Sequence, residues 1–115
     1  MSKGKAAEAA VADELLRRGM SLLARNYRFH RLGEIDLVVA DRGAVCFVEV
    51  KSRSSDRFGS PAEAVTAAKV RRIRRIAACF LQERRLEDRE VRFLAASVQC
   101  ESDGRVSCIE ILPFD

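Results

Sequence analysis

The chain has 115 residues, of which 48% are hydrophobic and 33% are charged, and its formal net charge is +4. This balance excludes an intrinsically disordered chain, and the length predicts a single domain over residues 1–115 with one core. No apolar run is long enough to cross a bilayer, and the N-terminal segment lacks the apolar stretch of a signal peptide. We therefore expect no membrane association and a cytoplasmic location. The modest positive charge permits a nucleic-acid partner without requiring one.

The N-terminal part of the chain predicts a helix followed by a strand. Ala7 and Val11 belong to an alanine-rich apolar stripe at helical spacing within residues 2–18, which is typical of a helix that packs closely on a sheet. Glu8 lies beside this stripe. Its local sequence favours a surface glutamate, and the alternative is a position at the edge of the buried face. Residues 20–29 then predict the first strand.

Residues 33–53 predict a hairpin of unusual composition. Residues 35–40 and 44–50 are rich in β-branched and apolar side chains, and a tight turn at Asp41-Arg42-Gly43 joins them. Charged side chains nevertheless interrupt these core-like strands. They are Glu34, Asp36, Glu49 and Lys51.

The register of this hairpin decides which charges meet. Alternation places Glu34 and Asp36 on one face with Val38, and a hairpin loop with an even number of residues sets Asp36 opposite Glu49 and Glu34 opposite Lys51. Like charges at directly opposed positions repel, so two facing carboxylates favour a site for a divalent cation that takes oxygen ligands. An odd loop with a bulge would shift the register by one residue and weaken this interpretation.

The segment after the hairpin predicts a polar loop and a long basic helix. Arg53 and nearby serines offer donors to a phosphate, although a flexible connector has the same composition. The string Ser60-Pro61-Ala62-Glu63 is a capping box that predicts a helix start, and apolar spacing predicts a helix over residues 66–85. A charge run is usually a solvated helix face, but this one exceeds what solubility needs. The residues that we expect to contact a phosphate backbone are Lys69, Arg71, Arg72, Arg74 and Arg75.

The C-terminal third predicts a second hairpin, formed by residues 90–100 and 105–112, with no cluster of catalytic residue types. We expect a central mixed sheet in which the strand at 44–50 runs parallel to the strand at 90–100, with the basic helix as the crossover. The four cysteines form no C-x-x-C pair, so we expect buried free thiols and no zinc site.

Asp36 together with Glu49-Val50-Lys51 resembles the D…E-x-K signature of the PD-(D/E)XK nuclease superfamily. A longer ordered set is similar to the YraN family of small endonuclease-like bacterial proteins. This set consists of Gly33-Glu34-Ile35-Asp36-Leu37, Phe47-Val48-Glu49-Val50-Lys51-Ser52-Arg53, Phe58-Gly59 and Lys69. The similarity extends from the helix that carries Gly4 and Glu8 through Arg92-Phe93, which is most of the chain.

The resemblance implies an α/β restriction-endonuclease-like fold, with a central mixed sheet flanked by helices, and a metal-dependent endonuclease that cuts DNA with Mg²⁺ or Mn²⁺. It makes Asp36 and Glu49 metal ligands and gives Lys51 the task of orienting or deprotonating the attacking water. Glu8 matches an acidic residue that related Holliday-junction resolvases place beside the metal, which implies branched or otherwise structured DNA as substrate. Glu34 has a supporting place. One departure is Leu94, because family members tend to have aspartate after the Arg-Phe dipeptide.

Several alternatives stay open at the level of sequence. An exposed ion pair between Glu34 and Lys51 would contribute only ~0.2 to 1 kcal/mol, too little to explain carboxylates at the centres of apolar strands. A non-catalytic DNA-binding or partner-binding module could retain the same fold and basic surface. RNA is an alternative substrate, since a basic helix does not distinguish the sugars. Homodimerisation and a protein partner are both compatible with the sequence.

Overall fold

The computed structural model describes residues 3–54 and 66–114. Its elements follow the predicted order. They are α1 (Lys3–Arg17), β1 (Ser21–Phe29), β2 (Gly33–Asp41), β3 (Ala44–Ser54), α2 (Ala67–Arg84), β4 (Val91–Cys100) and β5 (Val106–Pro113). Neither described helix is long and apolar enough to cross a membrane.

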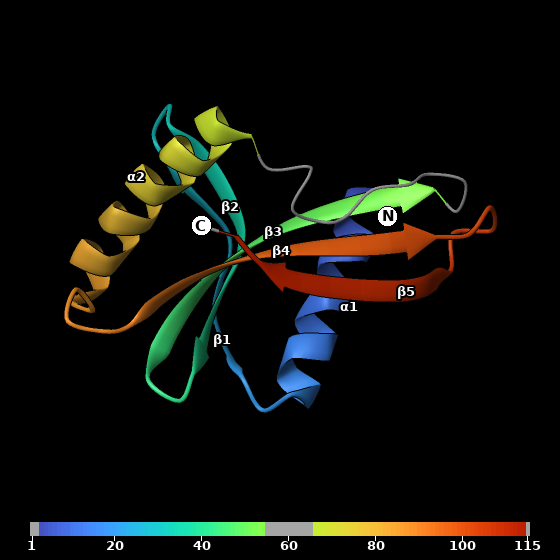
Figure 1. The fold of residues 1–115 in the computed structure, drawn as a ribbon, viewed down its shortest axis with the longest axis horizontal. Coiled ribbons are helices and arrows are strands. Elements are labelled where there is room, and N and C mark those ends of the chain that lie inside the picture. The colour runs from blue at the N-terminus through green and yellow to red at the C-terminus, as the bar shows by residue number, and fades with distance from the viewer. Residues whose placement is uncertain (1–2, 55–65, 115) are drawn as a thin grey trace.

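The strands form one five-stranded sheet in the order β1-β2-β3-β4-β5 (Figure 1). β3 and β4 are parallel and the other neighbouring pairs are antiparallel. A parallel pair needs a crossover connection, and α2 lies in the connection between β3 and β4, as predicted. The predicted α/β class is confirmed, and the mixed sheet with two helices is compatible with a restriction-endonuclease-like fold.

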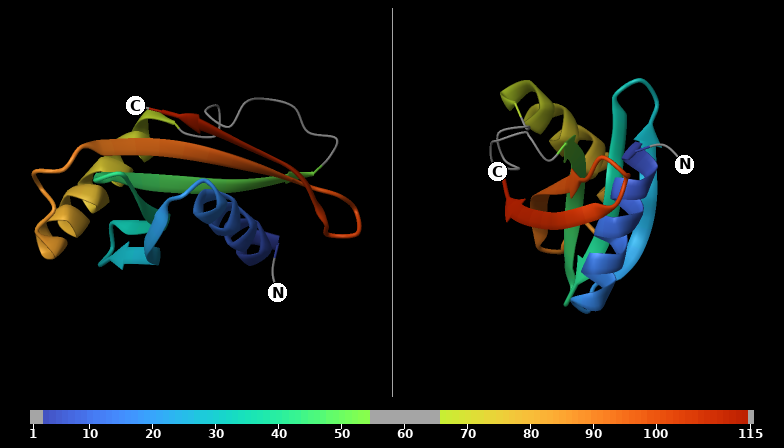
Figure 2. Two further views of the ribbon diagram at one scale, coloured as in Figure 1. Left: turned by 90° about the horizontal axis from the view of Figure 1, so that it is seen from below. Right: turned by 90° about the vertical axis from the view of Figure 1, so that its right-hand side faces the viewer.

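The sheet divides the buried side chains into two layers, where the sequence predicted one core. On one face, α1 places Ala7, Val11 and Leu15 against strand residues that include Val48. On the other face, α2 packs a second cluster around Phe80. The ring of Phe80 meets Tyr27 and Phe47 edge-on at centroid distances of 5.0 and 5.8 Å. Figure 2 shows α1 and α2 lying apart, at different parts of the sheet.

The β2–β3 hairpin has the predicted even register. Ala40 pairs with Val45, and the two turn residues Arg42 and Gly43 have φ values of 53° and 91°. Positive φ at both positions is what a two-residue turn of type I′ requires. The last pair of the ladder joins Leu37 to Val48. The strands therefore separate immediately before the predicted pair of Asp36 and Glu49, and the predicted opposition of Glu34 and Lys51 lies outside the ladder.

The alternation of β2 is interrupted at Asp36. Leu37 and Val39 pack on the α1 side of the sheet, whereas both Ile35 and Val38 belong to the α2-side cluster. The prediction that Glu34, Asp36 and Val38 share one regular face is therefore wrong. The ladder with β3 ends at Leu37, and although β2 stays paired with β1 through Ile35 and Glu34, the strand turns over at Asp36.

α2 begins at its own cap. Thr66 has an extended backbone and its side-chain oxygen accepts a hydrogen bond of 3.2 Å from the backbone N–H of Lys69. This is the usual N-cap arrangement. The capping box predicted at residues 60–63 lies outside the described residues.

All four cysteines are free thiols, but they are not all buried. Cys46 and Cys100 lie in the core and Cys79 is half-buried. Cys108 is exposed on β5, which is an edge strand, so the prediction of a buried thiol is wrong there. β5 has a neighbouring strand on one side only, so its side chains are less covered than those of a central strand.

Candidate active site

The opening between β2 and β3 is occupied by the side chain of Asp36. Its Oδ2 accepts a hydrogen bond of 2.7 Å from the backbone N–H of Val50, one residue beyond Glu49 on β3. The carboxylate thus replaces the backbone partner that β2 no longer supplies after the ladder ends. This arrangement fixes a charged side chain in the gap between two central strands.

Three carboxylates from two elements meet at this opening. Glu8 of α1, together with Glu34 and Asp36 of β2, offers one oxygen each within 4.8 Å of one another. The side chain of Glu8 is only 13% exposed, so it lies at the edge of the buried face and not on the open surface. Glu34, which was predicted to have a supporting place, is a full member of this group. Glu49 is not.

Glu49 lies on the other side of Asp36 and faces α2. Its side chain is 14% exposed, and its Oε2 is 3.8 Å from Nζ of Lys69 in the first turn of α2. Lys69 was predicted to contact a phosphate backbone together with the arginines of the basic helix. In the structure it forms an ion pair with Glu49, a candidate site residue, and the predicted phosphate contact stays a prediction.

Burial and mutual repulsion raise the proton affinity of both central carboxylates. The pKa of Asp36 is raised to about 6, mainly by burial and also by the charges of Glu8 and Glu34, while the hydrogen bond from Val50 opposes the rise. The pKa of Glu49 is raised to about 7, mainly by burial and also by the charge of Asp36, while Lys69 and Arg72 oppose the rise. Hard oxygen ligands whose negative charges repel one another suit a bound divalent cation, which would neutralise them.

Asn26 is a residue of this site that was not predicted from the sequence. It lies in β1 with φ of 50°, and its side-chain amide donates to Glu8 at 3.0 Å and to Glu34 at 3.1 Å. The signal available in the sequence was an asparagine inside a predicted strand, where this residue is depleted. Asparagine also tolerates a left-handed backbone better than other non-glycine residues.

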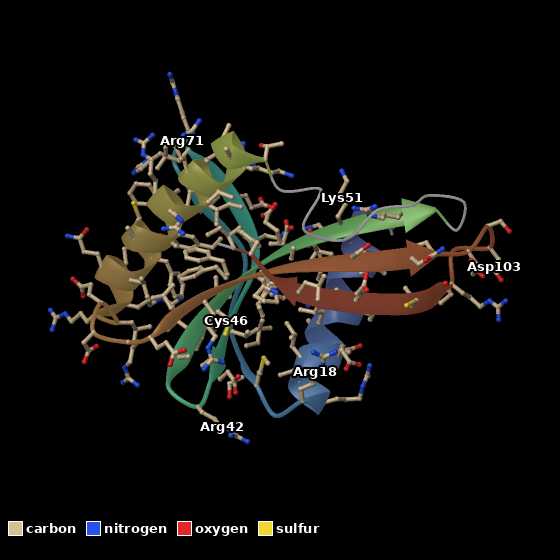
Figure 3. All side chains as sticks on the ribbon, viewed as in Figure 1. Arg18, Arg42, Cys46, Lys51, Arg71 and Asp103 are labelled. Atoms are coloured by element: carbon tan, nitrogen blue, oxygen red, sulfur yellow. The ribbon has the colours of Figure 1, made fainter. Side chains whose placement is uncertain are left out.

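The remaining predicted residues lie around this opening. Lys51 is exposed on β3, and alternation places it on the same face as Glu49 (Figure 3). Arg53 is half-buried near the end of β3. The four α2 arginines that were predicted to contact a phosphate backbone are all exposed, and they are Arg71, Arg72, Arg74 and Arg75. Figure 3 shows Arg71 extending away from the sheet.

Two contacts connect the α2 arginines with the sheet. The side chain of Arg72 lies close to Gly33, the first residue of β2. A Cβ atom added to Gly33 would be 3.5 Å from both Cδ and Nε of Arg72. The guanidinium of Arg74 lies 5.5 Å from the ring centroid of Phe93. The charge of Arg72 also lowers the pKa of Glu49, so this arginine acts on the group of carboxylates.

Leu94, the position at which family members tend to have aspartate, faces away from Glu49. It packs against the α1-side cluster and its register partner on β3 is Val48. The register partner of Glu49 is Ala95, whose side chain points to the opposite face. The leucine thus extends the core and leaves the group of carboxylates unchanged.

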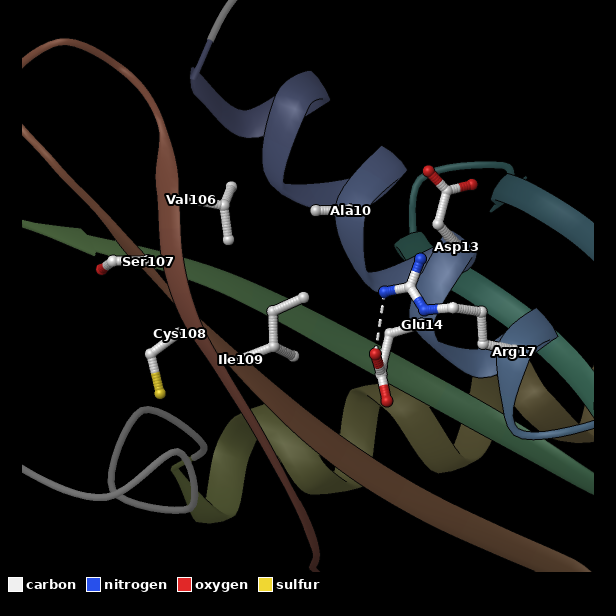
Figure 4. Close-up of a pocket in the computed structure, with 8 residues that line it drawn as sticks. All are labelled: Ala10, Asp13, Glu14, Arg17, Val106, Ser107, Cys108 and Ile109. Carbon is white, nitrogen blue, oxygen red and sulfur yellow. Dashed lines mark hydrogen bonds and ion pairs between the residues drawn. The ribbon is translucent and has the colours of Figure 1, made fainter.

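A separate hollow of about 480 Å³ lies between α1 and β5 (Figure 4). It is lined by α1 residues from Ala10 to Arg17 and by Val106 to Ile109 of β5. Its glutamate, Glu14, bonds to Arg17 at 2.8 Å and to Arg18 at 2.9 Å, which holds the pKa of Glu14 below its ordinary value. The carboxylates whose pKa is raised, Asp36 and Glu49, lie at the β2–β3 opening and not in this hollow.

The fold and the site together define a class of protein. An α/β sheet that opens between two central strands and gathers carboxylates at the opening, with an E-x-K string on the second strand, is the arrangement of the PD-(D/E)XK-like group. The profile of the Uncharacterised protein family UPF0102 matches residues 7–109. The chain belongs to this family, which is the YraN group.

Individual relatives cover nearly the whole chain. A UPF0102 protein of Symbiobacterium thermophilum is 47% identical over 105 residues, which is 91% of this chain and 88% of the relative. A UPF0102 protein of Moorella thermoacetica is 42% identical over 110 residues, covering 96% and 91% of the two chains. A UPF0102 protein of Mycolicibacterium gilvum is 48% identical over 98 residues, covering 84% and 79%.

Proposed function

We propose that the protein is a metal-dependent endonuclease that hydrolyses phosphodiester bonds of DNA, with branched or otherwise structured DNA as its substrate. The observation that carries the proposal is the gathering of carboxylates at the β2–β3 opening. Glu8, Glu34 and Asp36 converge within 4.8 Å, and Glu49 lies beside Asp36 with its pKa raised to about 7. A site built only for stability would avoid this repulsion.

The donor set fits Mg²⁺ or Mn²⁺. The available ligand atoms are carboxylate oxygens, which both ions prefer, and no described cysteine or histidine belongs to the group. Asp36 and Glu8 would hold the ion, with Glu34 or Glu49 completing the protein ligands. Such an ion polarises the phosphate and lowers the pKa of a water molecule that it binds.

The cationic side chains around the carboxylates can act on the phosphate groups of the substrate. Lys51 is exposed two residues after Glu49, where its ammonium can orient the water or stabilise charge that develops on the phosphate. Lys69 and Arg72 border Glu49 and can bind a phosphate next to the scissile one. The exposed arginines further along α2 offer contacts to the phosphate backbone that are independent of sequence.

The competing proposal is a DNA-binding module without catalysis. The exposed basic face of α2 favours it, because that surface could bind a phosphate backbone without any contribution from the carboxylates. The two proposals differ in what the carboxylates do, and metal binding therefore separates them.

Calorimetric titration of Mn²⁺ into the wild-type protein at pH 8 tests the enzyme. We expect a site that is lost in Asp36→Asn and retained in Asp13→Asn, a matched control at an exposed position of α1. With Mg²⁺, the wild type should cut DNA, and Lys51→Ala should bind the metal without cutting. DNA binding with no Mn²⁺ site in the wild type would favour the module, and cutting of RNA but not DNA would correct the substrate.

A further inference from the structure

We infer that Asn26 is a positioning residue of this site, which holds Glu8 and Glu34 in the arrangement that binds the metal ion. The inference rests on the proposed function and assigns to β1 a part in the site that the nuclease signature does not include. Asn26 is the only asparagine in the chain. It lies on neither of the elements that carry the signature residues.

The backbone places Asn26 beside the opening. Its neighbours Arg25 and Tyr27 pair with Leu37 and Ile35, so the register sets Asn26 opposite Asp36. No pair joins these two residues in the described ladder, and φ of Asn26 is 50°. The left-handed residue of β1, Asn26, therefore lies opposite Asp36, the residue at which the alternation of β2 is interrupted. This backbone conformation directs the amide toward the carboxylates instead of along the sheet.

The side chain of Asn26 directs both of its donor protons to this group of carboxylates. Nδ2 has two protons, and it donates to Oε1 of Glu8 at 3.0 Å and to Oε2 of Glu34 at 3.1 Å. Oδ1 accepts from Nζ of Lys5 at 2.9 Å. The amide thus joins one carboxylate from α1 to one from β2, and the ammonium of Lys5 fixes which end of the amide faces them.

A neutral donor is the chemically appropriate group for this place. An amide proton satisfies one oxygen of a carboxylate and leaves the carboxylate its charge, so the group still attracts a cation. Nζ of Lys5 already lies 3.8 Å from Glu8 and Nη2 of Arg28 lies 3.6 Å from Glu34, so a further cation between the two carboxylates would neutralise them more fully and compete with the metal. An aspartate would add a further negative charge and could donate nothing. Groups that orient metal ligands in this way typically change metal affinity by ~10- to 100-fold when they are removed.

Asn26→Gly removes the side chain and keeps the backbone conformation, because glycine adopts the left-handed conformation without strain. The variant therefore tests the amide group alone. Arg25→Gly is the matched control, since it adds a glycine at the adjacent exposed position of the same strand. Circular dichroism and the urea midpoint report folding in both variants. Mn²⁺ affinity from calorimetry is the readout that a merely structural role would not change.

We expect Asn26→Gly to fold and to bind Mn²⁺ ~10- to 100-fold more weakly than the wild type, and Arg25→Gly to bind it as the wild type does. Raising the Mn²⁺ concentration should restore cleavage by Asn26→Gly but not by Lys51→Ala. Wild-type affinity in folded Asn26→Gly would overturn the inference and leave the proposed function intact. Absence of a Mn²⁺ site in the wild type would overturn both.

Asn26→Asp provides a second test should the glycine variant unfold. It keeps the acceptor for Lys5 and tolerates the same backbone, but it lacks both donors. Weakened Mn²⁺ binding would support the inference. Affinity equal to or tighter than that of the wild type would show that a donor is not needed at this position, and would overturn it.

Discussion

Replacing Asp36 by asparagine should stabilise the metal-free protein at neutral pH while it removes the metal site. The pKa of Asp36 rises from its ordinary 3.8 to about 6 in the folded state, mainly through burial. Between these values the folded state binds more protons than the unfolded state, so the free energy of unfolding falls as the pH rises. The stability that the protonated group provides is complete below pH 4 and is lost as the pH rises through 6.

The magnitude follows from the size of the shift. The difference between 6 and 3.8 is about 2 pKa units. At about 1.4 kcal/mol for each unit, the upper limit is about 3 kcal/mol, and contact of the carboxylate with solvent lowers the expected gain to ~1 to 3 kcal/mol. Asparagine retains an oxygen that can accept the 2.7 Å hydrogen bond from Val50, so the substitution removes the charge and keeps the contact.

Urea unfolding in EDTA at pH 4 and pH 8 measures this effect. We expect Asp36→Asn to match the wild type at pH 4 and to exceed it by ~1 to 3 kcal/mol at pH 8. Asp13→Asn, at an exposed position, should stay within ~0.5 kcal/mol of the wild type at both pH values. A variant that is less stable than the wild type at pH 8, or a difference that does not change with pH, would refute the reasoning.

The remaining predictions concern the cations and the pH dependence of the site. Mn²⁺ affinity should fall below pH 6 to 7, where Asp36 and Glu49 take up protons, by about tenfold per pH unit for each proton that the metal must displace. Calorimetry in buffers of different ionisation enthalpy should then show that protons are released when Mn²⁺ binds. Lys69→Ala should move this dependence to higher pH because it removes a charge that lowers the pKa of Glu49; an unchanged profile would contradict that ion pair. The double variant of Arg71→Ala with Arg75→Ala should reduce the salt slope of DNA binding by about 2 and leave Mn²⁺ affinity unchanged, whereas an unchanged slope would exclude both arginines from the interface.

Local patterns predicted the elements that carry the site. The two-residue turn at Arg42 and Gly43 set the register of the hairpin, and the β-branched strands and amphipathic helices appear within a few residues of their predicted bounds. Regular alternation then predicted Asp36 directly opposite Glu49. Regular alternation fails at Asp36, one residue before Leu37, where the ladder with β3 ends. β2 is still paired with β1 there, but β1 has a left-handed residue, Asn26, at the level of Asp36.

Local patterns alone could not predict the composition of the carboxylate group, and Glu8 was named only through the family resemblance. Glu8 lies 26 residues before Glu34 in the sequence, and only the packing of α1 on the sheet brings them together. Asn26 contacts this group from β1, where its φ is 50°, and regular strand geometry does not predict such an angle. Periodicity describes regular elements, whereas this site is built where two strands leave their regular geometry.

The central claim is that the group of carboxylates cuts DNA with a divalent cation. The most direct test is cleavage of labelled linear, nicked, flapped and four-way-junction DNAs with Mg²⁺, Mn²⁺ or EDTA, with Asp36→Asn, Glu49→Gln and Asp13→Asn beside the wild type. We predict cutting that requires metal, favours a branched substrate, disappears in the first two variants and persists in Asp13→Asn. Binding of every substrate without cutting, with either metal, would contradict the claim and favour a module that only binds DNA.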